Sequence, residues 1–186
     1  MNLSRHQRAL RAFLWRLMDV TPLLDGLAYR GPADFVLRHG RWMRPGPWDD
    51  GWPEGLPRRC FGNSITQAAL RGWKYVEGYA LPEAGRLPVQ HAWNLDRSGR
   101  LADVTWRNKG VAYLGVEFAL GRADDATWNG DADVLDDWRR GWPLFREPWR
   151  GEDFAREWAF SEPLRLLLAE AAASAAGGDT CDAASR

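Results

Sequence analysis

Cysteine and long apolar runs are both scarce in this chain of 186 residues. It has two cysteines, Cys60 and Cys181, which are too few for a disulfide framework and fit a reducing compartment. No run of 18 apolar residues occurs, and the apolar stretch between Arg11 and Arg16 is too short for a signal-peptide core. We therefore expect a cytoplasmic protein that is not bound to a membrane, although a phage or secreted-effector origin fits the same features.

Excess charge is also missing, because 25 Lys and Arg balance 25 Asp and Glu. This balance argues against a nucleic-acid-binding protein, whose affinity would rest on surplus basic charge. No group of His or Cys has zinc spacing, and no Gly-rich loop could hold a phosphate, so we expect no metal and no cofactor. The length suits one domain, predicted over residues 1–176, with a small polar tail at 177–186 that we expect to be disordered.

Hydrophobic periodicity divides the chain into helices and strands. Helices are predicted over 4–18, 32–39, 60–71 and 164–176, with one or two more on the surface within 123–162. Strands are predicted over 73–81, 89–96, 100–106 and 110–119. Residues 41–59 form a long loop that carries four prolines and three tryptophans. This order predicts an α+β fold, in which an antiparallel sheet packs on the 60–71 helix and the N- and C-terminal helices flank it.

The residue types that suit nucleophilic chemistry gather between Cys60 and Trp106. Cys60 stands at the predicted start of a helix, directly after Arg58 and Arg59. Helix N–H groups, the positive end of the helix dipole and two guanidinium groups would favour the thiolate form of the sulfur. A lone cysteine is more often a small buried residue, so the interpretation depends on a partner base.

His91 and Asp103 supply that base and a group to orient it. A three-residue hairpin loop with Gly99 in the left-handed conformation pairs Asp96 with Arg100. The same register places Asp103 diagonally across from His91, on the same face of the sheet. A carboxylate there accepts a hydrogen bond from one imidazole nitrogen and leaves the other for the thiol, which is the arrangement of a nucleophile, a base and an orienting acid.

These residues resemble the transglutaminase-like cysteine hydrolases, which belong to the papain-like group. The resemblance rests on the order Cys, His, Asp, with Gly78-Tyr79 ahead of the histidine, then His91-Ala92-Trp93, and Asp103-Val104-Thr105 after it. It covers residues 60 to 106. It implies that Cys60 is the nucleophile, His91 the general base and acid, and Asp103 the residue that orients the imidazole.

The resemblance implies acyl transfer on a peptide or protein amide through a thioester. Hydrolysis, deamidation and cross-linking all remain open. The backbone N–H of Cys60 is one expected donor to the oxyanion, and the second is either the indole of Trp52 or the amide of Asn63. Trp93 is a further candidate on the substrate side. The residue after Cys60 is Phe61, where many members of the family have tryptophan.

Two other functions compete with this one. The chain can be an inactive binding module that engages a protein partner through its tryptophan-rich loops and acidic surface. An arylamine-type acetyltransferase would use the same order of residues, but it needs a bound thioester donor, for which the sequence offers no site.

Overall fold

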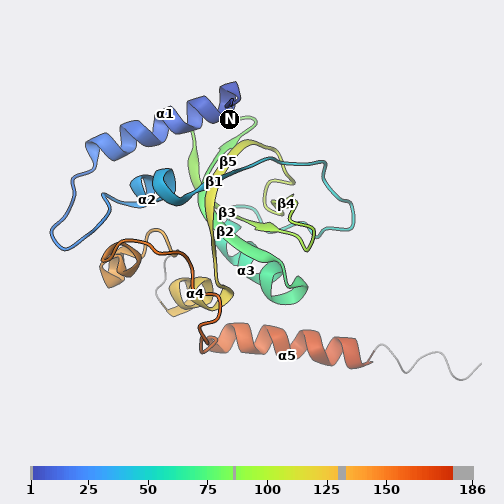
Figure 1. Ribbon diagram of the computed structural model, residues 1–186. Helices are drawn as coiled ribbons and strands as arrows, with labels where there is room; N and C mark the ends of the chain where they lie inside the picture. The colour runs from blue at the N-terminus through green and yellow to red at the C-terminus, as the bar shows by residue number, and fades with distance from the viewer. Residues whose placement is uncertain (1, 86, 130–132, 178–186) are drawn as a thin grey trace, which may run out of the picture.

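The computed structural model describes residues 2–85, 87–129 and 133–177, and it is an α+β fold built on one antiparallel sheet (Figure 1). The strands lie in the order β1-β5-β2-β3-β4. Their bounds are β1 Arg41–Met43, β2 Lys74–Pro82, β3 Val89–Leu95, β4 Leu101–Ala102 and β5 Gly110–Phe118. The helices are α1 Arg5–Val20, α2 Pro32–His39, α3 Cys60–Arg71, α4 Leu120–Asp124 and α5 Glu162–Gly177.

The helices pack on the sheet through alternate residues of its central strands. Tyr75 and Tyr79 of β2 point into the larger core, where they meet apolar side chains of the first three helices. Val76 and Ala80 point to the other face and pack with Trp93 and other residues in a second, smaller core. Figure 1 shows α1 and α5 at opposite ends of the molecule, with the sheet and α3 between them. None of the helices in the described ranges is both long enough and apolar enough to cross a bilayer.

The helix predictions are confirmed at four places. The first helix forms as Arg5–Val20 and begins with a capping box, in which the side chains of Ser4 and Gln7 each accept a hydrogen bond from the other residue's backbone N–H. The helices expected over 32–39 and 60–71 both have the expected bounds. The last helix also forms, and it begins two residues earlier than expected.

The predictions were wrong in three segments. The strand expected over 100–106 is only Leu101–Ala102, because the chain enters a turn after Asp103. The 41–59 loop contains the short strand β1 at its start, paired with β5. In the described part of 123–162, between the end of α4 and the start of α5, the chain forms a π-helical stretch, Asp125–Asn129, and two short 3-10 turns, Trp138–Arg140 and Pro143–Phe145, in place of the expected surface helices. The tail expected at 177–186 lies outside the described residues, apart from Gly177 at the end of α5.

Candidate active site

The helix α3 places Cys60 at its first position, after an unusual turn of the backbone. Arg58 has a φ of 62°, in the left-handed region that non-glycine residues seldom adopt, and Arg59 precedes the helix with φ −121° and ψ 41°. The amides of the first helical turn have no acceptor within the helix, so the N–H groups of Cys60 and Phe61 remain available beside the sulfur. Cys60 is half-buried.

His91 lies on β3, directly opposite Gly78 of β2. The imidazole is only 2% exposed, and its Nε2 lies 2.8 Å from Oδ2 of Asp103. The partner strand has no side chain at the paired position, so the ring is not crowded from β2. The second ring nitrogen, Nδ1, is then the one left for another partner.

Asp103 reaches His91 through the expected hairpin. The backbone N–H of Asp96 donates to the carbonyl of Arg100 at 2.9 Å, Gly99 has a φ of 80°, and Leu95 pairs with Leu101. The predicted register is therefore confirmed. The fully buried carboxylate of Asp103 lies diagonally across from His91 on a chain that has just left the strand.

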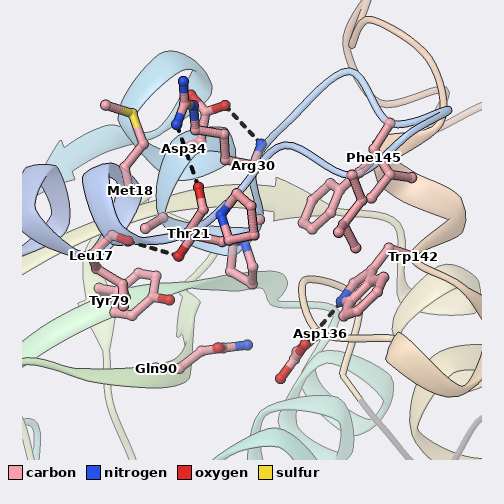
Figure 2. A pocket seen from close by; sticks show the side chains of 16 residues that line it. Leu17, Met18, Thr21, Arg30, Asp34, Tyr79, Gln90, Asp136, Trp142 and Phe145 are labelled. Carbon is pink, nitrogen blue, oxygen red and sulfur yellow. Dashed lines mark hydrogen bonds between the residues drawn. The ribbon is translucent and has the colours of Figure 1, made fainter.

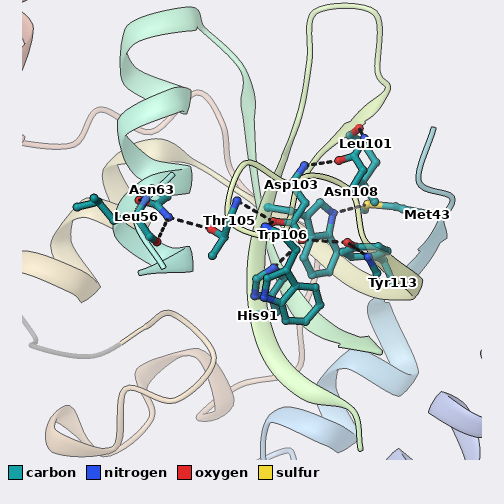
Figure 3. A network of polar contacts seen from close by, with 12 residues as sticks. Met43, Leu56, Asn63, His91, Leu101, Asp103, Thr105, Trp106, Asn108 and Tyr113 are labelled. Carbon is teal, nitrogen blue, oxygen red and sulfur yellow. Dashed lines mark hydrogen bonds and ion pairs between the residues drawn. The ribbon is translucent and has the colours of Figure 1, made fainter. Parts of the chain in front are cut away.

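The carboxylate of Asp103 is held by four hydrogen bonds (Figure 3). Besides its bond to His91, Oδ2 accepts one from the hydroxyl of Tyr113 at 2.8 Å. Oδ1 accepts from the backbone N–H groups of Thr105 and Trp106, each at 3.0 Å. These last two bonds turn the chain away from β3 and end the strand. The carboxylate is thus fixed from three sides before it meets the imidazole.

The pKa of His91 reflects its burial and two neighbouring side chains, Asp103 and Cys60. Burial disfavours the charged ring and by itself would lower the pKa of His91. The hydrogen bond with Asp103 and the interactions with Asp103 and Cys60 act in the opposite direction and raise the pKa to about 9. Cys60 thus lies within electrostatic range of the imidazole. At neutral pH the imidazole holds its second proton.

Trp106 covers the His91–Asp103 pair from outside. Its ring stacks on the imidazole with centroids 3.8 Å apart and planes inclined by 13°, while Trp93 lies beyond the imidazole at 6.2 Å. Figure 3 shows the indole of Trp106 lying across His91. A hydrogen bond screened from water in this way is stronger than an exposed one, because the surrounding dielectric is low.

The structure places the accessory residues away from the roles expected of them. Both N–H groups of the Asn63 amide are occupied, at 2.8 Å to the carbonyl of Leu56 and at 2.9 Å to the hydroxyl of Thr105. Asn63 therefore fastens α3 to the turn after Asp103 and has no proton left for an oxyanion. Trp93 is fully buried, and its indole N–H donates to the sulfur of Met43, so it does not reach a substrate.

Trp52 belongs to a separate aromatic cluster. Its ring makes edge contacts with Trp48 and Trp73, each with centroids 5.5 Å apart, and the guanidinium of Arg100 lies over it. The side chain is 9% exposed and packs against Ala102. Trp52 thus packs the long loop onto the outer end of the hairpin. The backbone N–H of Cys60 lies at the first position of α3, and its role as an oxyanion donor stays a prediction.

Sequence reasoning missed three residues that position the pair. Tyr113 holds Asp103, Trp106 covers His91, and the side chain of Asn108 accepts the backbone N–H of Asp103 at 2.8 Å. Asn108 has a φ of 57°, and asparagine tolerates this conformation better than most residues. A turn at this asparagine was the one signal in the sequence that could have shortened the predicted strand.

The chain matches no protein-family model, no curated protein and no solved structure. The α+β fold and the His91–Asp103 pair therefore stand on the structure alone.

Proposed function

We propose that this protein is a cysteine-dependent acyl-transfer enzyme, of the transglutaminase-like kind, that acts on a peptide or protein amide. The proposal rests on one observation: Asp103 holds Nε2 of the buried His91 imidazole at 2.8 Å, and Cys60 lies within electrostatic range of the same ring. A buried carboxylate that orients an imidazole, with a cysteine near the same ring, is the order of groups that thiol acyl transfer uses.

The first half-reaction makes a thioester. The sulfur of Cys60 attacks the carbonyl carbon of the amide, and the carbonyl oxygen becomes an oxyanion near the backbone N–H of Cys60. As the carbon–nitrogen bond breaks, the protonated imidazole of His91 gives its Nδ1 proton to the leaving amine. Asp103 keeps the ring oriented throughout and stabilises its positive charge while the ring is protonated.

The second half-reaction regenerates the thiol. His91, now neutral, takes a proton from a water molecule or an amine as that nucleophile attacks the thioester carbonyl. The carbon–sulfur bond breaks, the acid or the new amide leaves, and the sulfur regains its pairing with the imidazolium. Water gives hydrolysis or deamidation, and an amine gives cross-linking.

Alkylation of the thiol tests the reactivity on which this chemistry depends. We expect the full chain carrying Cys181→Ser to react with iodoacetamide at pH 6.5 at least tenfold faster when folded than when denatured. The added His91→Ala change should bring the rate down to that of the denatured thiol. Removal of Cys181 confines the label to Cys60, which mass spectrometry of the intact protein then counts.

Acylation tests the chemistry itself. The same Cys181→Ser protein, exposed briefly to p-nitrophenyl acetate, should gain one acetyl group on Cys60 that hydroxylamine removes. The Asp103→Asn variant should acylate far more slowly. A Cys60 that neither alkylates quickly nor acylates would contradict the enzymatic proposal and favour the inactive binding module.

A further inference from the structure

A separate cavity of about 300 Å³ lies between the first two helices, β2, β3 and the irregular chain around residue 142 (Figure 2). Cys60, His91 and Asp103 are not among the described residues that line it. Gln90 lines it and is the neighbour of His91, and consecutive residues of a strand point to opposite faces. The cavity is therefore a site apart from the one that holds the imidazole.

Most of the cavity wall is apolar. Leu17 and Met18 come from α1, and Ala33 comes from α2. Trp142 lies directly before the second 3-10 turn, Pro143–Phe145, and Phe145 ends that turn. The exposed residues Leu24 and Arg30 also line it, so the space opens to solvent on their side. A volume of this size suits a small ligand and lies at the low end for sites that bind one.

One side of the cavity is polar and rich in hydrogen-bond acceptors. Tyr79 pairs directly with Gln90 across β2 and β3, and Figure 2 shows both side chains on the same side as Asp136. The hydroxyl of Tyr79 has no hydrogen-bond partner among the described residues, although the side chain is only 6% exposed. Because Tyr79 lines the cavity, its hydroxyl is available to a ligand or a water molecule there.

The other two polar side chains also have atoms to spare. Gln90 uses its amide N–H to reach Asp133 at 2.8 Å, which leaves its carbonyl oxygen free within the described chain. Asp136 accepts the indole N–H of Trp142 through Oδ1 at 3.0 Å, and its Oδ2 has no partner among the described residues. Two oxygen acceptors, one of them on a carboxylate, and one hydroxyl on this side of the cavity thus have no partner among the described residues.

The nearby charges favour a cation on that side. Burial first, and then the negative charges of Asp136 and Asp133, raise the pKa of Tyr79, so the phenol stays neutral beside two acids. Arg30 is exposed, and the carboxylate of Asp34 is already bonded to Arg38 and to the backbone of Arg30. An anion would therefore meet acceptors and negative charge, whereas an ammonium group supplies three donors and the opposite charge.

We propose that this cavity binds an aliphatic primary amine, with its alkyl chain against Leu17, Met18 and Phe145 and its ammonium group donating to Asp136, Gln90 and Tyr79. The chemistry is that of an alkylammonium ion or a lysine-like side chain. The site does not depend on a reactive Cys60, so the proposal stands apart from the acyl-transfer chemistry above.

Three probes of equal chain length test the proposal by titration calorimetry on the full chain near pH 7. Hexylamine should bind at least tenfold more tightly than 1-hexanol, because both fill the apolar wall but only the amine carries the charge. Hexanoate should bind more weakly than either. Equal affinities for hexylamine and hexanol, or no binding of hexylamine, would overturn the proposal.

Variants locate the site within the chain. Asp136→Asn should weaken hexylamine binding about tenfold and leave hexanol binding unchanged. Tyr79→Phe removes a hydroxyl that has no partner among the described residues, and it should weaken hexylamine binding several-fold. Glu170→Gln, an equal loss of charge on the exposed face of α5, should change neither. Cys60→Ala should bind hexylamine as the parent does. Unchanged hexylamine binding in both Asp136→Asn and Tyr79→Phe would contradict the proposal that the amine binds in this cavity. If Asp136→Asn does not fold, the affinity of Tyr79→Phe for hexylamine tests the proposal by itself.

Discussion

At the scale of single residues, Asp103 is the side chain on which the geometry of the candidate site depends. Its two oxygens accept hydrogen bonds from an imidazole, a phenol and two backbone amides. Only the bond to His91 needs a negative charge to hold an imidazolium. The other three bonds position the carboxylate, and an amide of the same shape could keep the two that reach Oδ1.

Asp103→Asn therefore removes the negative charge of the side chain at position 103 and keeps its shape. An asparagine N–H group that faces Nε2 donates to it and forces the imidazole into the tautomer with its proton on Nδ1. In that tautomer Nδ1 cannot accept a proton from the thiol or from the nucleophile. We expect the acylation rate of Cys60 to fall by about 10³-fold or more. Burst kinetics with an activated ester measure that rate.

Asp34→Asn is the matched control. Asp34 is also buried and ion-paired, but with Arg38 on α2. Its loss should lower the free energy of unfolding without changing the acylation rate of the folded protein. An acylation rate that falls equally in both variants would show that Asp103 acts only through stability.

At the scale of elements, the backbones of β2 and β5 approach each other closely next to the position of His91. Gly78 of β2 sits between His91 of β3 and Gly115 of β5, and both pairings are direct. A Cβ built on Gly78 would collide with the backbone carbonyl oxygen of Leu114, which the sheet holds in place. One built on Gly115 would lie 2.6 Å from the carbonyl oxygen of Glu77 and from the ring of Trp93. The close approach of these strands therefore requires glycine.

Gly78→Ala should destabilise the protein by about 3 kcal/mol or more, because the colliding atoms are backbone and cannot move aside as a side chain would. Urea unfolding measures the difference. Gly62→Ala on α3 serves as the control, since a Cβ there meets nothing within 4 Å and alanine gains about 0.5–1 kcal/mol over glycine in a helix. Similar losses from both substitutions would contradict the close approach described.

The elements also show which parts of the structure could be predicted. The hairpin at 96–100 follows from local turn chemistry, and so does the helix that Cys60 begins. Tyr113 and Trp106 could not be placed, because their contacts with the His91–Asp103 pair depend on how the turn after Asp103 folds back. The cavity of Figure 2 brings Tyr79 of β2 and Gln90 of β3 together with Asp136, Trp142 and Phe145. No spacing in the sequence indicates that these distant residues meet.

At the scale of the whole molecule, buried titratable groups govern the dependence of stability on pH. His91 has a pKa of about 9 in the folded chain and an ordinary value of 6.5. Burial raises the pKa of Asp133 to about 6, and burial together with Asp133 raises that of Glu77. In each case the folded state binds more protons than the unfolded chain, so stability falls as pH rises through these values.

The free energy of unfolding should therefore decrease between pH 6.5 and pH 9, with His91 contributing on the order of 3 kcal/mol. The stabilisation by its charged form is complete below pH 6.5 and is lost as pH rises through about 9. Urea titrations at a series of pH values measure this loss. The slope should be clearly shallower in Asp103→Asn, and a parent protein that gains stability over the same range would contradict the assignment of charge to His91.

Nuclear magnetic resonance of the imidazole nitrogens gives the most direct test of the pairing of Cys60, His91 and Asp103, because the chain has only three histidines to assign. We predict that both ring nitrogens of His91 keep their protons until about pH 9 and that Cys60→Ala lowers this midpoint. A His91 that loses its proton at or below pH 6.5, with a midpoint indifferent to Cys60→Ala, would contradict the account.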